Sequence, residues 1–264
     1  MTHRPFWIGT GWKMNMTQGK TMTYVARLQA LLPPARDDVS VFIVPPFTAL
    51  ATARRALDVP GMPPVLLGAQ NMHWAESGAY TGEISAAMLN DIGTDLVELG
   101  HSERRSAFGE TDETVNLKVK AVLANGMRPL VCVGDTAAEH HAGASVETIV
   151  RQVKMAFADI TPEQLARCLV AYEPIWAIGD HGVPAEPLFV VEAHRVIRQA
   201  LCERTSAPVP ILYGGSVNQA NALDFSRESE IDGLFIGRSA WSAEGLANIV
   251  VTAVDMRRKV GLLP

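Results

Sequence analysis

Short runs of apolar residues, rich in Val, Ile and Leu, recur along the whole chain and are separated by longer stretches with helical periodicity. The runs are nearly continuous in apolar residues instead of alternating with polar ones, which is typical of parallel strands covered on both faces. We predict eight strands, at Phe6–Gly9, Val39–Val44, Val65–Ala69, Asp95–Leu99, Arg128–Val133, Cys168–Tyr172, Val209–Tyr213 and Asp232–Gly237.

The intervening stretches carry helix start and stop signals. Asn125-Gly126 closes one apolar helical stretch directly before a predicted strand, as a helix C-terminus does. Thr161 followed by Pro162 and Gln164 has the order of an N-cap, a first-turn proline and a capping-box residue. Strands and helices that alternate in this way predict a parallel sheet with right-handed crossover connections.

This alternation fits either an open doubly wound sheet or a closed barrel. Eight strands in 264 residues leave about 33 residues per unit, and the total length is close to the roughly 250 residues typical of a (β/α)8 barrel. The turn at Pro60–Pro64 is too short to separate two domains. We therefore predict an α/β fold, a single (β/α)8 TIM barrel whose one domain spans residues 1–264.

Composition narrows the class of protein and its partners. Hydrophobic residues make up 48% of the chain and charged residues 19%, which excludes intrinsic disorder. The net charge of −5 disfavours nucleic acid or an anionic membrane as the main partner, and no apolar run is long enough to span a bilayer. Three widely spaced cysteines, Cys132, Cys168 and Cys202, predict neither a disulfide framework nor a zinc site. We expect a soluble cytoplasmic protein.

Candidate chemistry lies where several predicted strands end. Lys13 follows the first strand, His101 the fourth and Glu173 the sixth, while the glycine-rich turns Gly214–Ser216 and Gly237–Arg238 follow the seventh and eighth. Each feature alone has a structural explanation: a solvated charge, a helix cap, a loop start or a tight turn. The carboxyl ends of barrel strands meet at one face, where barrel enzymes have their sites. Their joint placement therefore favours one active site with phosphate-binding turns.

At this point the chain resembles the triosephosphate isomerase family, and the resemblance runs in order over nearly its whole length. Four segments carry it: Gly11–Asn15, Glu98–Arg105, Ala171–Gly179 and Tyr213–Val217. Since each segment falls at the strand end where the family has it, the match is specific. The resemblance implies a TIM barrel that isomerises a small phosphorylated sugar through an enediolate.

The resemblance also implies roles for individual residues. Glu173 would be the base that removes a proton from the carbon beside a ketone and returns it to the neighbouring carbon. His101 would act while neutral, as the group that donates a hydrogen bond to the enediolate oxygens. Lys13 would supply a fixed positive charge. Glu103 resembles a supporting glutamate close to these groups.

Binding functions follow from the same resemblance. The residues that match phosphate-binding positions are Gly179, Ser216, Gly237 and Arg238. The segment Glu173–Gly179 resembles a lid that closes over the substrate and excludes water. The loop Gly78–Glu83 resembles the one that inserts into a second subunit, so a homodimer is implied. The family's chemistry implies no metal and no organic cofactor.

Three positions depart from the family pattern. Gly11 stands where the family has an asparagine that touches the reacting end of the substrate. Arg238 replaces a second glycine in the phosphate turn, and the lid continues as Gly179-Asp180-His181-Gly182 where a small residue between two glycines is usual. The sequence leaves open whether the Arg238 side chain reaches the phosphate or points outward.

These departures leave several functions open: an ordinary triosephosphate isomerase, a non-catalytic phosphosugar-binding barrel, or an isomerase of a larger substrate. A Schiff-base aldolase would need a lysine inside a mid-barrel strand, whereas Lys13 lies past a strand end. The room left by Gly11 favours a substrate with a hydroxymethyl group in place of one hydrogen, such as L-erythrulose 1-phosphate, which would become D-erythrulose 4-phosphate.

The segments Gly9–Lys13, Gln70–Trp74 and Ile236–Trp241 resemble the L-erythrulose-1-phosphate isomerase branch of the family, which serves erythritol breakdown. This branch is therefore the favoured hypothesis, with triosephosphate isomerase as the alternative.

Overall fold

The computed structural model describes residues 4–179 and 182–264. Its eight parallel strands pair in sequence order, and β1 pairs again with β8, so the sheet closes into a barrel. The strands are β1 Phe6–Gly11, β2 Val39–Val44, β3 Leu66–Ala69, β4 Leu96–Leu99, β5 Arg128–Val133, β6 Leu169–Tyr172, β7 Ile211–Tyr213 and β8 Gly233–Ile236. The single (β/α)8 TIM barrel predicted from the sequence is confirmed.

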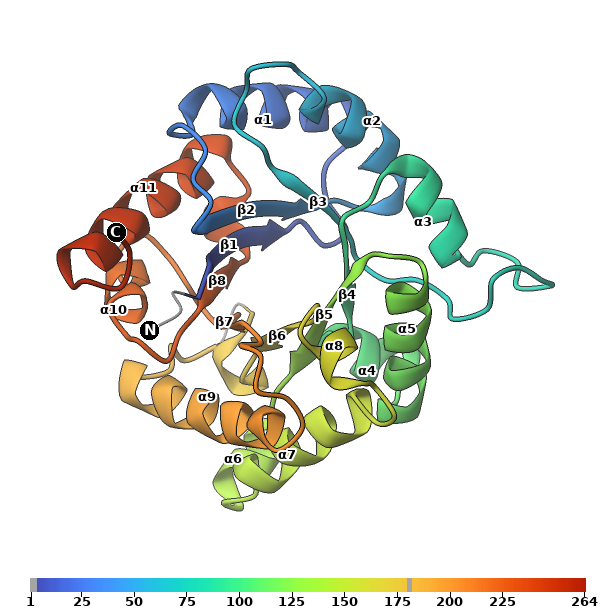
Figure 1. Cartoon of the computed structure of the whole chain (residues 1–264), viewed down its shortest axis with the longest axis vertical. Coiled ribbons are helices and arrows are strands. Elements are labelled where there is room, and N and C mark those ends of the chain that lie inside the picture. Colours follow the sequence, from blue (N-terminus) through green and yellow to red (C-terminus); the bar gives the residue numbers. More distant parts are fainter. Residues whose placement is uncertain (1–3, 180–181) are drawn as a thin grey trace.

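A ring of helices surrounds the strands on all sides (Figure 1). The helices are α1 Gln18–Leu31, α2 Phe47–Leu57, α3 Ala86–Ile92, α4 Ser102–Phe108, α5 Asp112–Ala124, α6 Ala137–His141, α7 Ser145–Ala156, α8 Pro162–Leu165, α9 Pro187–Cys202, α10 Ala222–Ser226 and α11 Ala243–Lys259, with short 3-10 turns η1 Ile175–Ala177 and η2 Arg238–Ala240. Within residues 4–179 and 182–264, no helix is long and apolar enough to cross a membrane.

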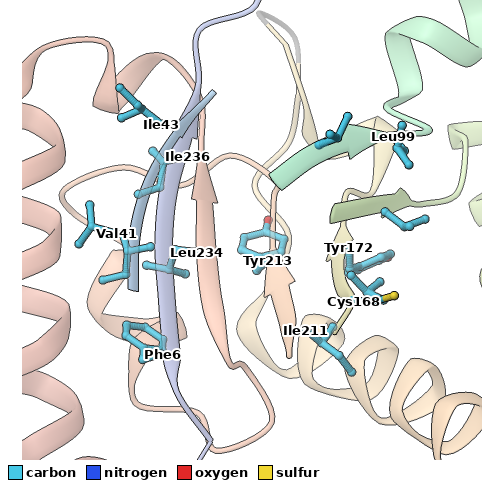
Figure 2. Packing of buried hydrophobic residues seen from close by; sticks show 14 of the residues in the cluster. Phe6, Val41, Ile43, Leu99, Cys168, Tyr172, Ile211, Tyr213, Leu234 and Ile236 are labelled. Carbon is cyan, nitrogen blue, oxygen red and sulfur yellow. The ribbon is translucent and has the colours of Figure 1, made fainter. Parts of the chain in front are cut away.

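Two hydrophobic clusters hold the layers together. Side chains alternate along each strand, so one set fills the barrel interior, with members such as Trp7, Phe42 and Leu212. The other set points outward and packs under the helices; Figure 2 shows part of it, including Phe6 and Leu234. Burial on both faces is the reason that the strands read as continuous apolar runs.

β2 and β5 have the predicted bounds, and the ends of the other strands differ from the predicted ones by at most two residues. β1 extends to Gly11, which pairs with Val44 of β2. β4 begins at Leu96, and the preceding Asp95 uses its carboxylate to accept a hydrogen bond from the Leu67 amide at 2.7 Å. These ends depend on cross-strand contacts, which a local pattern does not contain.

The predicted helix boundaries are confirmed. Thr161 caps α8, Pro162 occupies its first turn, and Gln164 completes the capping box. α5 ends at Ala124, and Gly126 beyond it has a φ of 82°, in the left-handed region that favours glycine. The three cysteines are free thiols.

Candidate active site

One cavity of about 370 Å³ lies at the carboxyl ends of the strands. All nine residues proposed for the site from the sequence line it: Gly11, Lys13, His101, Glu103, Glu173, Gly179, Ser216, Gly237 and Arg238. Gly11 ends β1, and the other eight lie in the segments that follow β1, β4, β6, β7 and β8. Barrel closure therefore brings together residues that are as much as 227 positions apart in the numbering, from Gly11 to Arg238.

Glu173 directly follows β6, and its position depends on two glycines. A Cβ atom at Gly134 would lie 1.9 Å from the Glu173 carbonyl oxygen, and one at Gly214 would lie 2.8 Å from Glu173 Cγ. The amide of Glu173 donates to the Val133 carbonyl at 2.8 Å. Because no side chain occupies either glycine position, the glutamate packs tightly against backbone and is held in one place.

The Glu173 carboxyl is buried, and its Oε2 atom has no hydrogen-bond partner among the described residues. Burial raises the pKa of Glu173 above its ordinary value, while the nearby His101 ring and the positive charge of Lys13 act in the opposite direction. A carboxylate with an unshared oxygen in a cavity has the properties of a general base.

His101 is the N-cap residue of α4. Its Nδ1 atom accepts a hydrogen bond from the Glu103 amide at 3.1 Å. An accepting Nδ1 carries no proton, so this contact selects the neutral imidazole with its proton on Nε2. Nε2 lies 3.6 Å from Glu173 Oε2, so the ring presents its N–H to the cavity beside the candidate base.

Lys13 has a φ of 51°, which is unusual for a residue other than glycine. The Gln70 side chain donates to the Lys13 carbonyl at 2.9 Å and to the Val44 carbonyl at 3.1 Å, which fixes this backbone conformation. The ammonium group forms an ion pair with Glu103 at 2.6 Å. Glu103 therefore contacts both Lys13 and His101, as its predicted supporting role requires.

The glycine-rich turns and the end of the lid segment meet on the opposite side of the cavity. The Ser216 hydroxyl donates to the Ala177 carbonyl at 2.6 Å. Arg238 Nη2 donates to the Gly179 carbonyl at 3.1 Å, so its side chain reaches across to the lid and lines the cavity. The sequence left this direction open. The unusual lid residues Asp180 and His181 lie outside the described residues.

The position of Gly11 is bounded by two residues that the sequence analysis did not select. A Cβ atom there would lie 3.2 Å from Phe235 Cζ and 3.7 Å from Glu98 Oε2. The Trp241 indole donates to the Gly11 carbonyl at 2.9 Å. The cavity therefore reaches Gly11, and the ring of Phe235 occupies part of the room that a side chain there would need.

Sequence reasoning missed Glu98, Gln70, Phe235 and Trp241 as parts of the site. Glu98 had a recognisable signal, since it is a carboxylate inside an otherwise apolar strand. Period-two alternation places it on the same face as Leu96, inside the barrel. Gln70, Phe235 and Trp241 contact the site because of where the closed barrel places them, and their residue types alone do not reveal this.

One group of potential metal ligands occurs in the described part of the chain. Oxygen atoms of Glu98 and Glu173 and the sulfur of Cys132 lie within 4.8 Å of one another. Burial raises the pKa of all three groups. Since metal ligation needs the deprotonated forms, this environment opposes metal binding.

A closed (β/α)8 barrel with a polar cavity at the carboxyl ends of its strands defines a class of barrel enzymes. The triosephosphate isomerase family model matches residues 6–253, and the chain belongs to that family.

Curated relatives refine the comparison. A Mesorhizobium japonicum protein named L-erythrulose-1-phosphate isomerase is 47% identical over 246 residues, which cover 93% of this chain and 96% of that protein. Proteins of the same name from Rhizobium etli and Rhizobium meliloti are 46% and 45% identical. These alignments cover 94% and 95% of this chain, and 94% and 97% of the respective relatives.

Proposed function

We propose that the protein interconverts L-erythrulose 1-phosphate and D-erythrulose 4-phosphate without a metal or organic cofactor. The observation that carries this proposal is the room at Gly11, bordered by Phe235 and the Glu98 carboxyl, beside the catalytic groups. In this proposal the hydroxymethyl group that replaces one substrate hydrogen lies at Gly11, between the Phe235 ring and the Glu98 carboxyl. The relatives named for this reaction support the same substrate.

The chemistry requires only proton transfers. Glu173 removes the proton from C3 of the ketose, and the C3–H electron pair forms the C2–C3 double bond of an enediolate while charge moves to the C2 oxygen. The Nε2–H of His101 donates to the enediolate oxygens and transfers a proton between them. Glu173 then returns its proton to C2, which leaves the ketone at C3. The positive charge of Lys13 stabilises the enediolate.

Phosphate binding is assigned to Gly179, Ser216, Gly237 and Arg238. The turns after β7 and β8 line the cavity, and barrel folds commonly bind phosphate at these turns. The segment from Glu173 to Gly179 would close as a lid, since water in the site would promote loss of phosphate from the enediolate. In this proposal the catalytic unit is one domain, residues 1–264.

Triosephosphate isomerase is the second candidate. Lys13, His101 and Glu173 act on any substrate with a ketone beside a hydroxyl-bearing carbon, and Phe235 narrows the room at Gly11. A non-catalytic barrel fits less well, because it would not need an unpaired base oxygen beside a neutral imidazole. A Schiff-base aldolase fits poorly, since the Lys13 amine lies past β1 in an ion pair with Glu103.

Relative catalytic efficiency on the two phosphates tests the substrate. We expect kcat/KM for L-erythrulose 1-phosphate to exceed that for dihydroxyacetone phosphate by at least about tenfold. Gly11→Asn, combined with Phe235→Leu to make room for the side chain, should shift the preference toward the triose phosphate. Equal or better efficiency with the triose phosphate in the unaltered protein would refute the substrate and leave the chemistry standing.

We further propose that the chain is a cytoplasmic homodimer that serves erythritol breakdown. The segment between β3 and α3, which contains the loop Gly78–Glu83, projects away from the barrel (Figure 1). Tyr80 at its tip is 48% exposed, and Met14, next to Lys13, is 96% exposed. Exposed apolar side chains on this loop and after β1 support burial against a second subunit.

A further inference from the structure

We infer that Glu98 recognises the terminal hydroxyl group of the four-carbon substrate and so sets the substrate length. The inference rests on the proposed function and adds a specificity residue to it. Glu98 is the third residue of β4, on the inner face of the barrel, and it lines the cavity. It lies below the catalytic groups, at the floor of the site.

Geometry places the Glu98 carboxyl at the position of the expected extra group. Its Oε2 atom lies 3.7 Å from the point where a Gly11 side chain would begin. If the substrate hydroxymethyl group occupies the room left by Gly11, its hydroxyl reaches this oxygen. Phe235 closes the same space from β8 and offers only carbon atoms. Glu98 is thus the polar group that borders this end of the cavity together with Gly11.

The surroundings of Glu98 do not explain it as a structural residue. It is 6% exposed, and its neighbours inside the barrel include Leu96 and Leu130. The hydrogen bond that it accepts comes from the Cys132 thiol at 3.9 Å, a weak donor. Burying a carboxyl without strong partners costs stability. A substrate hydroxyl would supply the missing partner.

Charge also fits this role. The titratable groups that face Glu98 are Lys13 after β1, His101 and Glu103 after β4, Cys132 in β5 and Glu173 after β6. Burial, with a contribution from Glu173, raises the pKa of Glu98 to about 7. Near neutral pH a large share of Glu98 is protonated, which reduces the negative charge beside Glu173. A protonated carboxyl can both donate to and accept from a hydroxyl group.

Substitutions at position 98, assayed on both substrates, test the inference. Glu98→Leu removes both hydrogen-bonding atoms, whereas Glu98→Gln keeps a donor and an acceptor of the same shape. We expect Glu98→Leu to lower kcat/KM for L-erythrulose 1-phosphate by about 100-fold or more, because the substrate hydroxyl then has no hydrogen-bond partner at this position. Turnover of dihydroxyacetone phosphate should change by less than about threefold, and Glu98→Gln should largely keep the four-carbon preference.

A substrate analogue tests the same contact without any substitution. In the 4-deoxy analogue a methyl group replaces the hydroxymethyl group, and the unaltered protein should turn it over about 100-fold less efficiently. Asp95→Asn, at the other end of β4, is the matched control and should leave the ratio of the two efficiencies unchanged.

Three results distinguish failure of the Glu98 inference from failure of the proposed function. Equal losses on both substrates in a folded Glu98→Leu variant would overturn the specificity role. Weak discrimination against the deoxy analogue, below about threefold, would overturn it even if that variant does not fold. Absence of four-carbon turnover in the unaltered protein would refute the proposed function itself, before any variant is made.

Discussion

The reactivity assigned to Glu173 comes from its immediate contacts. The carboxyl is buried against Gly214, one of its oxygens has no hydrogen-bond partner among the described residues, and His101 Nε2 lies 3.6 Å from it. Burial favours the protonated form, and Lys13 and His101 favour the charged form. This balance of opposing effects suits the role of general base that we propose for Glu173.

Glu173→Gln tests this assignment, since it keeps the shape of the side chain and removes the base. We expect kcat to fall by about 10²–10⁴, with KM changed by less than about threefold, because substrate contacts remain. Steady-state kinetics and solvent deuterium exchange into substrate would measure both effects. Glu163→Gln, an exposed change in α8, is the control. A variant that retained kcat would exclude Glu173 as the base.

Arg238 allows a second test at a single residue. Its guanidinium lines the cavity and donates to the Gly179 carbonyl at 3.1 Å, so it links the β8 turn to the lid. Arg238→Ala should raise KM about tenfold and weaken competitive inhibition by inorganic phosphate to a similar degree, with a smaller effect on kcat. Arg195→Ala, on the exposed side of α9, controls for lost charge. Unchanged phosphate inhibition would place Arg238 outside phosphate recognition.

At the level of elements, the strand ends aim the catalytic groups and nearby glycines make room for them. Gly214→Ala should push Glu173 aside, because the added Cβ would lie 2.8 Å from Glu173 Cγ and 3.0 Å from Oε1. We expect kcat to fall at least about tenfold, since a misplaced base loses much of its effect. Gly19→Ala in α1, where a Cβ meets open space, should leave activity unchanged. Full activity in Gly214→Ala would show that Glu173 tolerates displacement.

The sequence alone was enough to predict the strands and the loops that carry the proposed catalytic residues. Apolar runs marked every strand within two residues at each end, because strands buried on both faces leave a continuous pattern. Family-like segments then located Lys13, His101 and Glu173, and barrel closure brings their loops to one cavity.

Contacts between distant parts of the chain could not be read in this way. The direction of Arg238 depends on Gly179, which is 59 positions away in sequence. The role of Gln70 depends on the strained backbone of Lys13. The boundary of the Gly11 pocket depends on Phe235 from the other end of the chain. Each pairing exists only after the barrel closes.

At the scale of the whole molecule, the proposed dimer would bury the loop Gly78–Glu83. Tyr80 lies in this projecting loop and packs on His73, with ring centroids 4.1 Å apart. Tyr80→Asp would place a charge in the apolar interface and should shift the protein from dimer to monomer at micromolar concentrations. Sedimentation equilibrium would measure this shift. Leu188→Asp, an exposed change in α9, is the control. A monomeric unaltered protein would exclude the proposed dimer.

The stability of the whole molecule should depend on the charge of Glu98. In the unfolded chain this carboxyl titrates near its ordinary pKa of 4.5, whereas burial in the folded barrel raises the pKa to about 7. Between these values the unfolded state binds fewer protons than the folded state. The free energy of unfolding therefore falls as pH rises through this range, and the full contribution of Glu98 is present only below pH 4.5.

The Glu98→Gln side chain does not titrate, so this substitution should remove the fall in the free energy of unfolding that Glu98 causes as pH rises. Relative to the unaltered protein, the variant should gain about 1–3 kcal/mol at pH 8, or several degrees in Tm, and show a much smaller difference at pH 5. Thermal unfolding followed by circular dichroism at the two pH values would measure the gain. The exposed Glu163→Gln change should not reproduce this gain.

The contradicting outcome would be a gain in stability from Glu98→Gln, relative to the unaltered protein, that is no larger at pH 8 than at pH 5. That result would mean that the folded barrel holds Glu98 ionised. In that case the carboxylate could accept a hydrogen bond from the substrate hydroxyl but not donate one.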